Sequence, residues 1–207
     1  MRGCSMGIKH EPPRSYRLGD LKKPGRLTDT ALAELLELEG LRRRIKRTDL
    51  MVLDVGPGKK DVSSTAQHVV LSNVARDGAW HTLDINGRLE PTHTTDITKN
   101  TGIESGRYDL VFLLNVIEHL FDYRAALVES LRICRGILVV SVPFVYEYHT
   151  FPEDYWRMSP AALSAVLKDA GAMRCMTKFI ASNKATFGMA TTSPKGWNSV
   201  LLSAEKP

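Results

Sequence analysis

Two glycines stand directly after a short apolar run, where a backbone could approach a ligand closely. The run is Met51–Val55, and Gly56 and Gly58 follow it on either side of a proline. A glycine has no Cβ to keep the backbone away from a bound molecule. The pair alone is a weak signal, because an ordinary turn between a strand and a helix uses the same residues. The ends of the neighbouring apolar runs must therefore decide what the turn does.

Acidic residues stand at the ends of the next two segments that are expected to form strands. Asp84 lies near the end of 81–85, where a carboxylate can accept hydrogen bonds from both hydroxyls of a ribose. Asp96 follows 93–95 and is suited to an adenine amino group, with Ile97 against the ring. Each acid has an ordinary alternative as a cap, a turn residue or a solvated charge.

A fourth group, Leu114–His119, follows the apolar run 108–114, where a carbonyl or side chain can contact the ligand. Four such groups at four consecutive strand ends support a ligand-binding site much more strongly than any one of them does. The complete set of expected cofactor-binding residues is Asp54, Gly56, Gly58, Asp84, Ile85, Asp96, Ile97, Asn115 and Val116.

The glycine turn favours a nucleoside without a pyrophosphate. A dinucleotide site needs a third glycine for close helix packing, and Asp61 occupies that position. A phosphate-binding loop ending in Gly-Lys-Ser/Thr is also excluded, because residues 59–61 read Lys-Lys-Asp.

An aromatic segment is expected on the substrate side of the site. Six of the fifteen aromatic residues fall between Phe144 and Trp156, just after the apolar run 136–142. Aromatic faces there could stabilise a cation by about 0.5–2 kcal/mol each and shape a pocket. The alternative is a packed surface loop. The expected substrate-binding residues are Tyr146, Tyr148, Tyr155 and Arg157.

Two histidines are candidate general bases, because histidine titrates near neutral pH. They are His119 and His149. His119 could instead be a structural histidine at a helix start, and His149 could be a loop residue bonded to Asp154. Arg157 could clamp a substrate carboxylate or phosphate, or pair with Glu153 or Asp154.

The elements that must position these residues alternate between strands and helices, which predicts a doubly wound α/β sheet. Buried strands are expected at 51–55, 81–85, 93–96, 108–114 and 136–142, with two more at 174–180 and 199–204. Helices are expected at 122–132 and 160–170, the second with Ser159 as N-cap, Pro160 as first residue and Gly171 after its end. Residues 59–80 predict only a weak or shortened helix.

Charge divides the chain into an arm, residues 1–49, and a main domain, residues 50–207. Residues 1–50 hold twelve basic and seven acidic residues, whereas the rest holds sixteen of each. The arm includes a predicted helix at 29–46 whose basic end is either solvated or faces an anionic partner. Three scattered cysteines predict no disulfide framework and no metal site, and fit a cytoplasmic protein. No membrane span and no signal peptide are expected.

The motifs together resemble those of class I S-adenosylmethionine-dependent methyltransferases, over roughly residues 50–205. The resemblance rests on four segments, 52–58, 83–85, 96–97 and 108–119. Within the family, the likeness is to the branch with an Asn-Val-Leu-Glu-His-like fourth motif. Three later parts of the sequence also look like that branch: 142–144, His149 and 154–157. It implies a seven-stranded sheet with an antiparallel last strand. It also implies S-adenosylmethionine as cofactor, with the glycines by its methionine part, Asp84 on its ribose and Asp96-Ile97 by its adenine. Lys60 departs from the pattern, because many members have a third glycine there.

The resemblance predicts an enzyme that methylates an O or N atom of a small-molecule acceptor. One alternative is an RNA methyltransferase that uses the basic arm. Another is an inactive nucleoside-binding protein that serves as a partner of other proteins. The neutral main domain and the aromatic segment favour the small-molecule acceptor.

Overall fold

A computed structural model describes residues 49–57, 79–144, 148–149, 152–181 and 197–205 of the 207-residue chain. Five predictions concern residues outside these ranges: the helix at 29–46, the structure of 59–78, the arm as a whole, and the two site residues Gly58 and Tyr146. Within the described residues, no helix is both long and apolar enough to cross a membrane.

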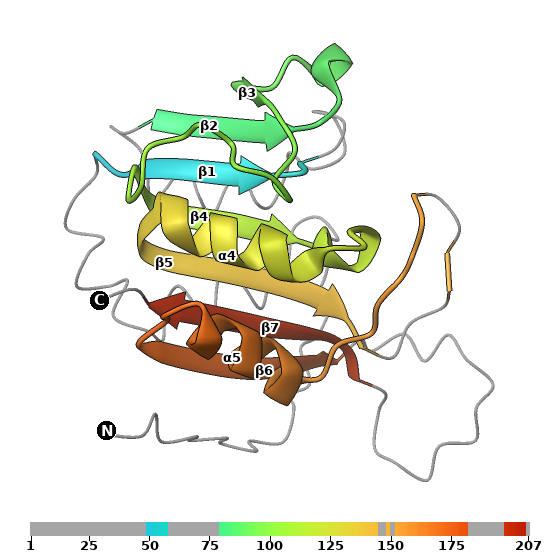
Figure 1. The fold of residues 1–207 in the computed structure, drawn as a ribbon. Helices are drawn as coiled ribbons and strands as arrows, with labels where there is room; N and C mark the ends of the chain where they lie inside the picture. Colours follow the sequence, from blue (N-terminus) through green and yellow to red (C-terminus); the bar gives the residue numbers. More distant parts are fainter. Residues whose placement is uncertain (1–48, 58–78, 145–147, 150–151, 182–196, 206–207) are drawn as a thin grey trace, which may run out of the picture.

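The described residues form one seven-stranded sheet, as predicted (Figure 1). Its order is β3-β2-β1-β4-β5-β7-β6, with β7 antiparallel to both of its neighbours and the first five strands parallel. The strands are β1 (Met51–Val55), β2 (Ala79–Asp84), β3 (His93–Thr94), β4 (Tyr108–Leu114), β5 (Cys134–Pro143), β6 (Arg174–Ala181) and β7 (Trp197–Glu205).

The central strands are largely apolar and nearly all buried, as is typical of parallel strands in the middle of a sheet. Six of the seven residues of β4 are buried, and nine of the ten residues of β5 are buried. Two helices, α4 (Tyr123–Ile133) and α5 (Pro160–Asp169), lie on one face of this sheet (Figure 1). Their inward side chains join the strands in one core cluster.

Both α4 and α5 begin directly after a residue whose side chain caps the helix. The Asp122 carboxylate accepts a hydrogen bond from the Ala125 amide at 3.1 Å, and the Ser159 hydroxyl accepts one from Ala162 at 3.2 Å. Pro160 is the first residue of α5, and Gly171 takes a φ of +96° just after its end. Local capping chemistry therefore sets the ends of these helices.

Strand bounds differ slightly from the predictions. β2 begins at Ala79, so Ala79 and Trp80 belong to a strand and not to the weak helix expected through residue 80. Backbone pairing extends β2 there, because Met51 and Val52 of β1 align with these two residues. β3 is only two residues long, and β5 extends past the predicted 136–142 at both ends.

Strand order reverses at β1, which lies between β2 and β4. In open α/β sheets, ligands bind beyond the carboxyl ends of the strands at such a reversal. The residues that follow β1, β2, β3 and β4 therefore define the edge of the sheet where a site is expected.

Candidate active site

The turn after β1 contacts the end of β2 and the residues that follow β4. Gly56 has a φ of +63°, and its amide donates a hydrogen bond to the Leu83 carbonyl at 2.8 Å. A Cβ on Gly56 would lie 2.9 Å from Cγ2 of Val116, closer than real Cβ atoms approach. Glycine is thus required here by backbone conformation and by packing against Val116, and the ligand approach predicted from sequence stays a prediction.

Asp84 ends β2 next to this turn and shapes its own loop. Its Oδ1 accepts a hydrogen bond from the Asn86 amide at 2.8 Å, and its carbonyl accepts one from Thr95 at 3.1 Å. Ile85 beside it is 71% exposed. The carboxylate is therefore held in place by the backbone, with an exposed apolar side chain at its side.

Asp96 and Ile97 separate into different roles. Oδ1 of Asp96 accepts hydrogen bonds from the Thr98 amide at 2.9 Å and the Thr98 hydroxyl at 2.8 Å, which fixes a turn. Ile97 is buried in the core cluster. Their predicted contacts with an adenine stay predictions.

Asp54 is a buried acid inside β1, two residues before the glycine turn. Burial raises the pKa of its carboxyl to about 7, because the charged form loses its hydration. A carboxyl with this pKa is partly protonated near neutral pH, so it can accept or donate a hydrogen bond at the site.

Asn115 takes a left-handed backbone conformation directly after β4. Its φ is +54°, and its amide donates a hydrogen bond to the Ser141 carbonyl at 2.9 Å. Asparagine tolerates this region better than most residues, and such conformations concentrate at functional sites. The bend leads into the short 3-10 helix η3 (Ile117–His119), which presents the fourth motif at the carboxyl edge.

Glu118 is the functional candidate that sequence reasoning did not single out. It is 1% exposed, and neither of its carboxylate oxygens has a hydrogen-bond partner within the described part of the chain. Burial raises the pKa of the Glu118 carboxyl to about 8, and the nearby negative charge of Asp154 adds to the shift. The only sequence signal was its place inside the fourth motif, beside His119.

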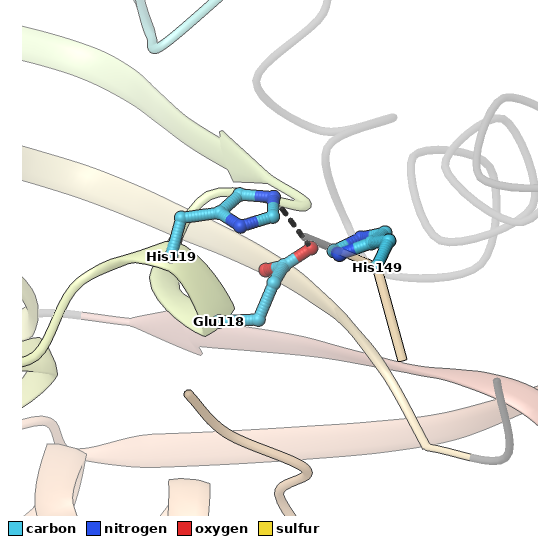
Figure 2. A group of neighbouring side chains, drawn as sticks. All are labelled: Glu118, His119 and His149. Carbon is cyan, nitrogen blue, oxygen red and sulfur yellow. Dashed lines mark ion pairs between the residues drawn. The ribbon is translucent and has the colours of Figure 1, made fainter. Parts of the chain in front are cut away.

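His119 lies against Glu118 and has a defined tautomer (Figure 2). Its Nδ1 is 2.8 Å from the Glu153 carbonyl, which only accepts, so Nδ1 carries the proton. In the neutral ring Nε2 then has the free lone pair, and it lies 3.7 Å from Oε1 of Glu118. Burial is the main cause that lowers the pKa of His119, which favours this neutral form.

His149 completes this group from the segment after β5. Its ring stacks on that of His119, with centroids 4.9 Å apart and planes 28° apart. Its Nδ1 lies 3.0 Å from Oδ2 of Asp154, in an orientation outside hydrogen-bond geometry, while its amide donates to the same oxygen at 3.1 Å. The two predicted catalytic histidines are thus neighbours.

Arg157 pairs with Asp154, one of the two arrangements expected from sequence. Its Nη1 donates to Oδ1 of Asp154, and its Nη2 donates to Oδ2 at 2.6 Å. These bonds lower the pKa of the buried Asp154 carboxyl to about 2. The pair fixes the loop that carries His149, and a contact of Arg157 with substrate stays a prediction.

The aromatic segment is partly packed and partly exposed. Tyr148 and Tyr155 expose 71% and 47% of their surface. Trp156 packs on Tyr123 and donates a hydrogen bond from Nε1 to the Leu120 carbonyl at 3.0 Å. Tyr155 is tied to the histidine group, because its amide donates to the Glu118 carbonyl at 2.7 Å.

Comparisons with known proteins bear on the fold. No protein-family model matches the sequence, and no curated protein matches it significantly. An S-adenosylmethionine-dependent methyltransferase from Archaeoglobus fulgidus matches in structure with a TM-score of 0.59 at 15% identity, over 86% of this chain and 94% of that one. The carbon methyltransferase DszA matches with a TM-score of 0.64 at 17% identity, over 91% of this chain and 57% of the other.

A third similar structure is the 1,6-didemethyltoxoflavin-N1-methyltransferase of Burkholderia thailandensis, with bound S-adenosylhomocysteine. Its TM-score is 0.59 at 14% identity, over 87% of this chain and 79% of the other. The strand order and the antiparallel β7, together with these matches, show that this chain has the class I methyltransferase fold.

Proposed function

We propose that the protein transfers a methyl group from S-adenosylmethionine to an O or N atom of a small-molecule acceptor. The observation that carries the proposal is the meeting of the Gly56 turn, the end of β2 and Val116 at one edge of this fold. The structural neighbours that use S-adenosylmethionine support this cofactor.

The residues fit the cofactor at two points. Gly56 provides backbone without a side chain at the strand reversal, and Asp84 provides a carboxylate at the end of the adjacent strand. We assign Asp84 to the ribose hydroxyls, because a carboxylate accepts two hydrogen bonds from neighbouring hydroxyls. The bound sulfonium would supply an activated methyl group, and the chain's own task is to bind and orient the two reactants.

The chain also offers groups that act on the acceptor. His149 is 36% exposed at its side chain and is held by the Asp154–Arg157 pair, so it can reach an acceptor and accept its proton. Tyr148 and Tyr155 are exposed nearby in sequence and are assigned to acceptor binding. His149 would take up the proton that the acceptor loses when it is methylated.

Calorimetric binding of S-adenosylhomocysteine tests the proposal. Asp84→Ala should weaken binding by about 100-fold or more, because two charge-assisted hydrogen bonds contribute about 1.5–3 kcal/mol each. Asp169→Ala, at a 72% exposed acid on α5, is the matched control and should leave affinity unchanged. Equal affinity of wild type and Asp84→Ala would refute the role of Asp84, and no binding by wild type would refute the proposed cofactor.

The acceptor class is tested separately, with a labelled methyl donor and a set of small metabolites and RNA. Turnover of a small acceptor that is insensitive to salt supports the proposal. Methylation of RNA with steep salt dependence would instead assign the basic arm, residues 1–49, to nucleic-acid binding.

A further inference from the structure

We propose that Glu118, His119 and His149 bind one divalent transition-metal ion of the Zn²⁺ type. One potential ligand atom from each of these residues lies within 4.8 Å of the other two (Figure 2). The sequence predicted no metal site, because the three scattered cysteines were the only metal ligands considered. His149 also lies about thirty positions after the other two residues, so no short motif joins the three. The proposal does not rest on methyl transfer, but it assigns the lone pair of His149 to an ion, so His149 cannot act as proton acceptor while the ion is bound.

Glu118 is the strongest reason to expect a cation. Its side chain is 1% exposed, and both of its oxygens lack a hydrogen-bond partner among the described residues. A buried polar group without a partner costs about 1–3 kcal/mol and more when charged, so native proteins rarely keep one without a use. Figure 2 shows one of these oxygens between the two imidazole rings.

His119 is prepared as a metal ligand by its hydrogen bond. Metal-binding histidines commonly donate the second ring N–H to a carbonyl or carboxylate, which fixes the tautomer and the ring direction. Nδ1 of His119 does this at 2.8 Å from the Glu153 carbonyl, which leaves the Nε2 lone pair toward Glu118. His119 can therefore bind a metal ion through Nε2 without losing the proton on Nδ1 and without breaking its hydrogen bond to Glu153.

His149 has a comparable support. Asp154 lies 3.0 Å from its Nδ1, and Arg157 holds both oxygens of that aspartate. A carboxylate behind an imidazole orients the ring and raises its strength as a ligand. Of the three residues, His119 thus has the supporting hydrogen bond expected around a bound metal ion, and His149 has a carboxylate oxygen 3.0 Å from its Nδ1.

The geometry fits a three-residue site with open positions. Ligands of Zn²⁺ lie about 2.0–2.2 Å from the ion, so two of them in a tetrahedral site are about 3.3–3.6 Å apart. The observed 4.8 Å limit requires these side chains to close by up to about 1.5 Å when the ion binds. The side chains of His119 and His149 are 17% and 36% exposed, so solvent or a substrate can reach the remaining positions.

The donor set selects the class of metal. Two imidazoles and one carboxylate suit zinc and related first-row metals, whereas Mg²⁺ and Ca²⁺ prefer oxygen ligands alone. An ion here would act as a Lewis acid for an oxygen or nitrogen of a bound molecule at the carboxyl edge.

Titration of the chelator-treated, full-length protein with Zn²⁺ in a calorimeter tests the site. Wild type should bind one equivalent that is lost in Glu118→Gln and His119→Ala, with affinity lowered about 100-fold or more, since supporting contacts alone already change affinity 10- to 100-fold. Glu104→Gln, at an exposed glutamate at the other end of the sheet, is the matched control and should bind as wild type does. Co²⁺ should give the visible absorption of a site with nitrogen and oxygen ligands in wild type and Glu104→Gln. Glu118→Gln and His119→Ala should not show this absorption.

Circular dichroism confirms that each variant is folded, and His149→Ala, at a more exposed ligand, provides a third test if a buried variant fails to fold. The absence of binding by wild type at millimolar Zn²⁺ would overturn the proposal. Unchanged binding by Glu118→Gln or His119→Ala would also overturn it, because the ion would then lie elsewhere on the chain. Binding of S-adenosylhomocysteine measured on the same samples shows whether the methyl-transfer proposal stands or fails separately.

Discussion

Two buried glutamates eleven residues apart meet opposite surroundings. Glu118 at the carboxyl edge has no hydrogen bond to either oxygen among the described residues, and burial raises the pKa of its carboxyl to about 8. Glu129 on α4 is 8% exposed, and hydrogen bonds from Arg132 lower the pKa of its carboxyl to about 2. Burial alone therefore does not decide the charge of an acid; the donors around it do.

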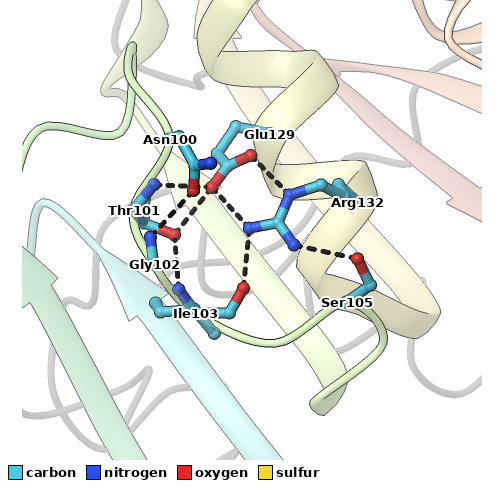
Figure 3. Close-up of polar contacts among 7 residues, drawn as sticks. All are labelled: Asn100, Thr101, Gly102, Ile103, Ser105, Glu129 and Arg132. Atoms are coloured by element: carbon cyan, nitrogen blue, oxygen red, sulfur yellow. Dashed lines mark hydrogen bonds and ion pairs between the residues drawn. The ribbon is translucent and has the colours of Figure 1, made fainter.

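The Glu129 network joins α4 to the loop before β4, near the amino ends of the strands (Figure 3). Thr101 donates to Oε1 of Glu129 from its amide at 2.8 Å and its hydroxyl at 2.7 Å. Arg132 donates to both carboxylate oxygens at 2.7 Å and also to the Ile103 carbonyl and the Ser105 hydroxyl. These hydrogen bonds are all made inside the protein, so we assign this region to the stability of the fold.

The comparison separates a stabilising region at the amino edge of the sheet from a candidate binding region at its carboxyl edge. Polar groups that satisfy one another lock the amino edge of the sheet. Among the described residues, the Glu118 carboxyl lacks such partners at the carboxyl edge, where the strand order reverses and a ligand can supply the missing contacts.

The largest expected effect is on stability when the amino-edge network is broken. Glu129→Gln removes the charge that Arg132 and Thr101 bind, and should lower the free energy of unfolding by about 3 kcal/mol. Urea unfolding at pH 7 measures it, with the exposed Glu104→Gln as control. A loss below about 1 kcal/mol would contradict the view that this network locks the fold.

The same network should give the protein an acid-sensitive stability. The pKa of Glu129 is about 2 when folded and near 4.5 otherwise, so its contribution is present above pH 4.5 and is lost as the pH falls toward 2. Unfolding measured from pH 7 to pH 2 should show the difference between wild type and Glu129→Gln shrinking over this range. A difference independent of pH would show that the carboxylate's charge is not what stabilises the network.

At the carboxyl edge, adding a side-chain atom at Gly56 should lower stability more than removing the charge of Glu118. Gly56→Ala should lower stability by about 2 kcal/mol, because a left-handed residue with a Cβ costs about 1–2 kcal/mol and this Cβ would meet Val116 at 2.9 Å. Urea unfolding checks the loss, and calorimetry should show weaker binding of S-adenosylhomocysteine as well. Gly171→Ala, with open space around its Cβ position, is the control for backbone strain alone.

The smallest stability effect is expected at the other glutamate. Glu118→Gln in metal-free protein should change the free energy of unfolding by less than about 1 kcal/mol, because no hydrogen bond among the described residues is lost. The same urea experiment measures it beside Glu129→Gln. A loss equal to that of Glu129→Gln would make Glu118 a structural residue and erase the contrast between the two edges.

Much of this molecule follows from its sequence. The predicted strand segments overlap all seven strands, and β1 and β4 have the predicted bounds. Ser159 and Pro160 located the start of α5, because capping depends on residues close in sequence. The alternation of strands and helices also placed Gly56, Asp84, Asp96 and Asn115 at one edge, since parallel strands all end on the same side.

Tertiary structure alone decided which side chains meet at that edge. Nothing in the spacing showed that His149 stacks on His119, that Arg157 selects Asp154 rather than Glu153, or that Glu118 is buried without a partner. These contacts depend on how the segment after β5 folds back over η3, and sequence periodicity describes single elements rather than the packing between distant ones. The difference between Glu118 and Glu129 has the same origin, because a carboxyl's charge follows from donors that folding brings to it.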